Sequence, residues 1–241
     1  MNSGLSTPRV AGLGRSLAAA VLIGLGVLQV APAPASVAAP DIRLRGNAEA
    51  PVTLIEYSDF TCGYCLKFFR ETWPRLQAKY VETGKVRFLY RDYPRADRGP
   101  GLDAAVAARC AGDQGRYWAM HDRLFAEGGR LDEAAFTRYA KAIGLSESDF
   151  GQCFRNGRHV EQIFQDRHEA NEWGFRGTPG FVLMYTKKAP TDREPAVAIP
   201  GAFPFEVFAE EIDRMLASVP ASQTQQGNGK AGRAMPPVIT Q

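Results

Sequence analysis

Two segments of the chain have the hydrophobic pattern of buried β-strands. The run PVTLIEYSDF, residues 51–60, is almost wholly apolar and rich in β-branched residues. The segment KVRFLYRDYP, residues 85–94, alternates at Val86, Phe88 and Tyr90, which also predicts a strand.

Between these strands the apolar residues recur at the spacing of a helix. Thr61 is the expected N-cap, which would put Cys62 at the first helical position, and Gly84 is expected to end the helix. Pro74 should kink or split it, because proline lacks an N–H and clashes with the preceding turn. The apolar positions of the predicted helix are Leu66, Phe69, Trp73, Leu76 and Tyr80.

The rest of the pattern is helical and then returns to strands. Residues 99–175 contain no convincing strand and predict about five helices. Short strands are expected over 181–186 and 196–201, and an amphipathic helix over 204–218. The predicted order is therefore β-α-β, a helical block, and β-β-α, in the α/β class.

Both ends of the chain fall outside this pattern. Residues 1–38 combine a basic start, an apolar stretch over 17–28 and small residues up to Ala35 and Ala38, which predicts a cleavable signal peptide. An uncleaved membrane anchor is the alternative. Residues 219–241 are rich in Gln, Gly and Pro and predict a disordered tail.

Composition adds two constraints. The 241 residues are 45% hydrophobic and 23% charged, which is ordinary for a soluble globular protein, and the formal charge of +3 is too small to suggest a nucleic-acid partner. Export would place the four cysteines in an oxidising compartment. We therefore expect Cys110 and Cys153 to form a structural disulfide between two helices, with two buried free cysteines as the alternative.

The other two cysteines form a C-x-x-C pair. Such a pair can be half of a zinc site, a structural disulfide or a redox-active dithiol. Zinc needs two further ligands nearby, and the remaining cysteines are far apart in sequence, so we expect no metal site. At a helix start, free N–H groups would favour an exposed Cys62 thiolate, while Cys65 would be shielded and resolve a mixed disulfide. Gly63 would let a substrate backbone approach.

Several motifs together carry a resemblance to a known family. They are Glu56 with SDFTCGYC at the first strand–helix junction, CAGDQGRYWAMHDRLF in the helical block, and GTPGF before the third strand. The chain resembles the DsbA-like exported thiol–disulfide oxidoreductases, which have a thioredoxin-like fold with an inserted all-helical subdomain. The resemblance divides the chain into thioredoxin-like parts at 45–98 and 176–218, around a helical insertion at 99–175.

The resemblance also implies roles for particular residues. Pro179 would follow a cis peptide bond and lie against the active cysteines, and the backbone of Thr178, with Gly63 and Tyr64, would bind substrate peptide. Glu56 would be a buried acid that exchanges protons with Cys65; an outward-facing strand carboxylate is the alternative.

The sequence leaves open whether the cysteine pair oxidises, isomerises or reduces its clients. Gly63 and Tyr64 replace the histidine of strongly oxidising relatives and resemble the dipeptide of disulfide isomerases or reductases. We expect a largely monomeric periplasmic or otherwise extracytoplasmic enzyme without a cofactor, less oxidising than the histidine-bearing members. It would introduce disulfides into unfolded or partly folded exported proteins with cysteines. A membrane redox partner, a quinone-linked oxidase or a membrane reductant, would complete the cycle. Alternatives are an isomerase or reductase, a kappa-type glutathione transferase, and a periplasmic copper-binding module at Cys62 and Cys65.

Overall fold

The computed structural model describes residues 41–127, 131–187 and 196–219. The predicted signal peptide, 1–38, and residues 220–241 of the predicted tail lie outside the described part. Within it, no helix is both long enough and apolar enough to cross a membrane.

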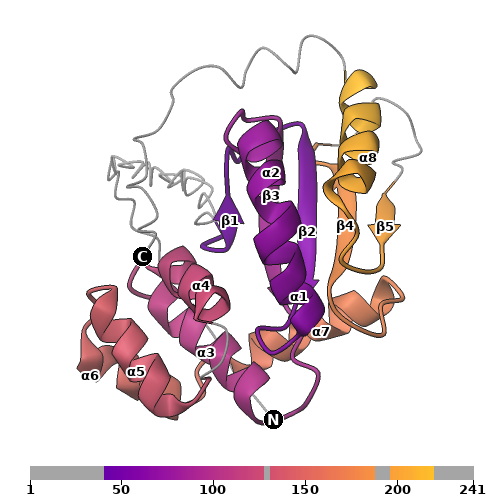
Figure 1. The fold of residues 1–241 in the computed structure, drawn as a ribbon. Helices are drawn as coiled ribbons and strands as arrows, with labels where there is room; N and C mark the ends of the chain where they lie inside the picture. The colour runs from indigo at the N-terminus through magenta and orange to yellow at the C-terminus, as the bar shows by residue number, and fades with distance from the viewer. Residues whose placement is uncertain (1–40, 128–130, 188–195, 220–241) are drawn as a thin grey trace, which may run out of the picture. The chain divides into compact units, whose positions relative to one another are not determined.

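A five-stranded mixed sheet forms the centre of the fold (Figure 1). Its order is β1-β3-β2-β4-β5; β2 and β3 run parallel, and the other neighbouring strands are antiparallel. This arrangement confirms the thioredoxin-like fold class expected from the sequence. The two-residue strand β1 was not predicted, because it is too short to show a period. The strands are β1 (Leu44–Arg45), β2 (Val52–Ser58), β3 (Val86–Asp92), β4 (Gly180–Tyr185) and β5 (Val197–Ile199).

The helical run after β2 passes Pro74 without ending. The N–H of Trp73 donates to the carbonyl of Phe68, five residues back, as in a π-helix. Such wider turns lie on both sides of the short segment that contains Pro74, so the missing N–H is accommodated rather than breaking the helix. The segments are α1 (Gly63–Lys67), η1 (Phe68–Thr72), α2 (Trp73–Leu76) and η2 (Gln77–Val81).

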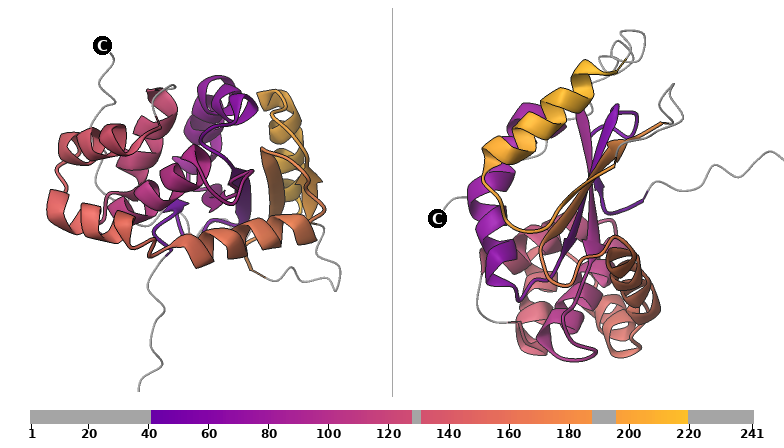
Figure 2. Two further views of the ribbon diagram at one scale, coloured as in Figure 1. Left: turned by 90° about the horizontal axis from the view of Figure 1, so that it is seen from below. Right: turned by 90° about the vertical axis from the view of Figure 1, so that its right-hand side faces the viewer.

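In the described residues between β3 and β4 there are five helices, where the sequence predicts about five. Figure 2 shows α7 on one face of the sheet, with α2 and the C-terminal helix α8 on the other. The inserted helices are α3 (Pro100–Gly112), α4 (Tyr117–Ala126), α5 (Glu133–Ala142), α6 (Glu147–Arg155) and α7 (Val160–Glu172); α8 spans Phe205–Ala217.

Alternation along β2 decides which side chains face the C-x-x-C helix. Val52 and Leu54 belong to the same core cluster as Phe68. Ile55 instead belongs to the smaller cluster on the opposite face. Since successive strand residues point to opposite faces, Glu56 lies on the face covered by α1.

Candidate active site

The first cysteine of the pair ends a tight turn between β2 and α1. Cys62 is the N-cap of α1, with an extended backbone, and its N–H donates to the carbonyl of Asp59 over 2.9 Å. The predicted cap at Thr61 is therefore wrong by one residue. The hydroxyl of Thr61 donates to the Asp59 carboxylate over 2.6 Å and is not available to cap the helix.

Cys62 is less accessible than the sequence suggested. It is only 5% exposed, and Cys65 is fully buried. The expectation of an exposed Cys62 was wrong, because side chains of the helical insertion come close to the start of α1. Cys62 borders a cavity of about 500 Å³ with Phe60, Thr61, Gly63, Leu66, Pro100, Leu124, Phe125, Leu131 and Asp132.

Hydrogen bonds to the Cys62 sulfur favour its thiolate. The Cys65 thiol makes the largest contribution, and with the backbone N–H groups of Cys65 and Tyr64 it lowers the pKa of Cys62 to about 5, against the opposing effect of burial. This is the ionisation expected of an attacking sulfur.

The pKa values of Cys65 and Glu56 are raised, in contrast to that of Cys62. Burial raises the pKa of Cys65, and the nearby Cys62 and Glu56 raise it further. Glu56 is 4% exposed, and burial raises the pKa of its carboxyl to about 8. The carboxyl therefore holds a proton near neutral pH, on the side of the sheet where Cys65 lies.

The loop before β4 closes the site from the other side. The Thr178–Pro179 peptide bond is cis, and the Cys62 sulfur lies 3.3 Å from the carbonyl oxygen of Thr178. The buried Thr178 hydroxyl has no other partner among the described residues, and a hydrogen bond from it to the Cys62 sulfur helps to lower the pKa of Cys62. At Gly180 a Cβ would lie 2.7 Å from the Phe175 ring, which explains a glycine at this strand entry.

The two residues between the cysteines face outward. Tyr64 is 69% exposed, and a Cβ added to Gly63 would meet nothing within 4 Å. A peptide can therefore approach this turn without displacing protein atoms.

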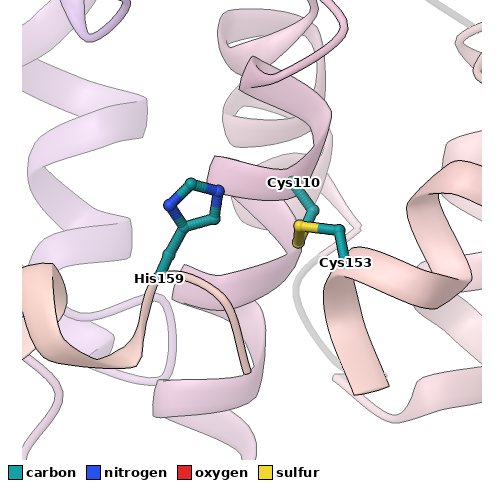
Figure 3. Close-up of side chains that lie close together, drawn as sticks. All are labelled: Cys110, Cys153 and His159. Atoms are coloured by element: carbon teal, nitrogen blue, oxygen red, sulfur yellow. A yellow bond between two sulfur atoms is a disulfide. The ribbon is translucent and has the colours of Figure 1, made fainter. Parts of the chain in front are cut away.

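The remaining cysteines lie away from this site. Cys110 in α3 and Cys153 in α6 form a disulfide with an S–S distance of 1.99 Å. The ring of His159 lies beside it, and the three potential ligand atoms are within 4.8 Å of one another (Figure 3). A disulfide sulfur is no thiolate, so in this state only the imidazole of the group is a good metal ligand.

One residue at the site gave no functional signal in the sequence. Asp59 is 2% exposed, and its carboxylate holds both the turn before Cys62 and the loop at Arg95. An aspartate between a strand and a helix is ordinary turn chemistry, so only the three-dimensional contacts distinguish it.

Comparison of sequences with known families and proteins gives a consistent result. The family described as Thioredoxin matches residues 39–194. A Na(+)/H(+) antiporter NhaA of Salinispora tropica is 37% identical over 141 residues, which are 58% of this chain and 21% of the antiporter. A Rickettsia conorii protein, named as a candidate protein-disulfide oxidoreductase, is 27% identical over 57% of this chain and 51% of its own length. The chain thus spans about half or less of these curated relatives.

Solved structures resemble the chain over most of their length. Wolbachia pipientis alpha-DsbA1 has a TM-score of 0.65 and 26% identity, covering 74% of this chain and 92% of that protein. A thioredoxin-like oxidoreductase from Silicibacter pomeroyi has a TM-score of 0.58 and 29% identity, covering 71% and 90%.

Proposed function

Because the chain belongs to the thioredoxin family, we propose that it is a thiol–disulfide oxidoreductase of the DsbA type that introduces disulfide bonds into exported proteins. The observation that carries this proposal is the contrast between two cysteines one helical turn apart. Hydrogen bonds lower the pKa of Cys62 to about 5, whereas burial raises that of Cys65. Cys62 is suited to form the bond with a client, and Cys65 to leave as a thiol when the client attacks.

The proposed cycle starts from the Cys62–Cys65 disulfide. A client thiolate attacks Cys62, forming a client–Cys62 disulfide, while Cys65 leaves with the electron pair and takes a proton from Glu56. A second client thiolate then attacks the client sulfur of that bond and releases Cys62 as a thiolate. The client gains one disulfide and loses two protons and two electrons, and the enzyme is left as the dithiol. No cofactor is needed, because the sulfur atoms carry the electrons.

The ionisation of Cys62 supports disulfide donation as the direction. A thiolate that is stabilised in the dithiol form makes the disulfide form more oxidising. A pKa of about 5 lies between the values of about 3.5 for strongly oxidising DsbA and about 7 for thioredoxin. We therefore propose an oxidase of intermediate strength, reoxidised by a quinone-linked membrane partner. With weaker oxidising power, the same site would serve an isomerase or reductase coupled to a membrane reductant.

A location outside the cytoplasm belongs to the same proposal. The Cys110–Cys153 disulfide suits an oxidising compartment, and the apolar stretch at 17–28 suits export, although that stretch lies outside the described residues.

The proposal is tested by oxidative refolding of a reduced, unfolded protein that needs its disulfides for activity. The oxidised wild-type chain should donate about one disulfide per molecule. Cys62→Ser and Cys65→Ser should both donate none, because neither variant can form the Cys62–Cys65 disulfide that supplies the oxidising equivalents. A Cys110→Ala, Cys153→Ala double variant is the matched control and should retain donation. Equal donation by wild type and Cys62→Ser would refute the proposal.

A further inference from the structure

The carboxylate of Asp59 joins three separate parts of the chain at the turn before Cys62. Its Oδ1 accepts from the N–H of Thr61 over 2.7 Å and from the Thr61 hydroxyl over 2.6 Å. Its Oδ2 accepts from the backbone N–H of Arg95 over 2.9 Å and lies 3.4 Å from that residue's Nε. A buried carboxylate with four such contacts is fixed in place.

The backbone of Asp59 contacts both cysteines as well. Its carbonyl accepts from the N–H of Cys62 over 2.9 Å. Its own N–H opposes the raised pKa of Cys65 by hydrogen bonding to that sulfur. Every polar group of Asp59 thus acts on the C-x-x-C turn or on the loop that supports it.

The third part of the chain is the start of helix α3, in the helical insertion. A Cβ added to Gly101 would lie 2.8 Å from Oδ1 and 3.1 Å from Oδ2 of Asp59. These distances are too short for real atoms, and the carboxylate has no freedom to move aside without giving up its hydrogen bonds. Gly101 therefore allows α3 to pack directly on the carboxylate.

We propose that Asp59 is a positioning residue that holds Cys62 against the N–H groups at the start of α1, and that α3 keeps it there through its contact at Gly101. This inference rests on the proposed redox role of Cys62. Asp59 touches no reacting atom with its side chain. It acts by fixing the turn that aims the Cys62 sulfur at the backbone of Tyr64 and Cys65, the groups that favour the thiolate.

The direction in which the pKa of Cys62 changes when Asp59 is replaced distinguishes a positioning role from a purely electrostatic one. A negative carboxylate near a thiol disfavours the thiolate, so removing that charge alone would lower the pKa of Cys62. Loss of positioning would instead move the sulfur away from its hydrogen-bond donors and raise that pKa. In an Asp59→Asn variant, one amide orientation places a donor against the N–H of Arg95, and the other places one against Thr61, so the turn is loosened at one end.

The test is a pH titration of the Cys62 thiolate by its ultraviolet absorbance in the reduced protein. We expect the midpoint to rise by about one unit in Asp59→Asn and in Gly101→Ala, which keeps the charge but displaces the carboxylate. Asp97→Asn is the matched control: this side chain is 81% exposed, lies in the same loop as Arg95, and should leave the midpoint unchanged. Gly101→Ala keeps the test decisive if Asp59→Asn does not fold.

A second readout is the equilibrium of the Cys62–Cys65 pair with glutathione. It should shift up to about tenfold toward the disulfide in both variants, because the reduced form loses thiolate stabilisation. A lower midpoint in Asp59→Asn, or an unchanged midpoint and equilibrium in Gly101→Ala, would overturn the positioning role. If the wild-type pair does not exchange with glutathione at all, the proposed function fails, while the titration still tests Asp59.

Discussion

At the scale of single residues, the site depends on where protons are held. Cys62 and Cys65 have identical side chains, yet hydrogen bonds favour the thiolate of the first and burial favours the thiol of the second. Glu56 is buried near Cys65, with its pKa raised to about 8, so it can supply the proton that a departing Cys65 sulfur needs. These protonation states suit the roles that we propose for the three groups: Cys62 as the sulfur that binds the client, Cys65 as the leaving sulfur and Glu56 as the proton donor.

Replacing the buried acid should stabilise the protein in a pH-dependent way. The pKa of Glu56 is raised from 4.5 to about 8, so the folded state binds a proton that the unfolded state releases between these values. The contribution of the Glu56 carboxyl to the free energy of unfolding is therefore fully present below about pH 4.5. It is lost as the pH rises through 8. We expect Glu56→Gln to be more stable than wild type by about 4 kcal/mol at pH 8 and equally stable at pH 4.

Urea unfolding of the reduced protein across this pH range measures the difference. Glu210→Gln, an exposed carboxyl on α8, is the control and should follow wild type at every pH. Parallel pH curves for Glu56→Gln and wild type would mean that Glu56 is not held protonated by burial.

At the scale of elements, apolar periodicity predicts most of the fold. It gives the strands β2 and β3 and the five inserted helices. It does not give β1, which has only two residues, or the π-turns around Pro74, which depend on how the backbone adapts to a missing N–H. The N-cap of α1 could not be predicted from the pattern either. Threonine is a common N-cap, but the Thr61 hydroxyl donates to the Asp59 carboxylate instead.

In the candidate site, too, local motifs identify some residues, whereas contacts between distant residues are not visible in the sequence. Cys62 and Cys65 are evident from their spacing, and Thr178 and Pro179 from the family resemblance. The cover over Cys62 comes from residues more than thirty positions away, such as Pro100 and Leu124, and no local pattern reports it. Asp59 and Gly101 are similarly distant in sequence, so their contact could not be anticipated.

The Cys110–Cys153 disulfide should stabilise the insertion by joining α3 to α6. It closes a loop with a sequence separation of 43, for which the chain-entropy estimate is about 4 kcal/mol. We expect the Cys110→Ala, Cys153→Ala variant to lose about 2–4 kcal/mol in the free energy of unfolding, measured in urea, with little change in the Cys62 titration. An unchanged free energy of unfolding would show that the disulfide adds nothing to stability.

At the scale of the whole described molecule, buried charges attach the helical insertion to the sheet. Arg109 of α3 donates to Asp92 at the end of β3 and to Asp166 of α7, each over 2.6 Å. Arg43, just before β1, also donates to Asp166, over 2.5 Å. These residues are widely separated in sequence, and their pairing links the two parts of the fold near the active-site edge.

Breaking this network should be costly. Arg109→Met leaves Asp92 with no cation among its contacts in the described residues and Asp166 with one fewer, so we expect a loss of about 3–5 kcal/mol in unfolding free energy. Arg123→Met removes an exposed i,i+4 pair with Glu127 and should cost less than about 1 kcal/mol. Similar urea midpoints for the two variants would contradict a structural role for the network.

The most direct test of the account is the redox equilibrium of the Cys62–Cys65 pair against glutathione in the wild-type protein. In the Cys110→Ala, Cys153→Ala variant Cys62 and Cys65 are the two remaining cysteines of the sequence, so a parallel measurement on that variant follows the active pair separately. A disulfide donor of the proposed kind should have a potential of about −120 to −200 mV, at which donation to client thiols is favourable. A potential near about −270 mV, that of thioredoxin, would contradict the oxidase and make the same site a reductant.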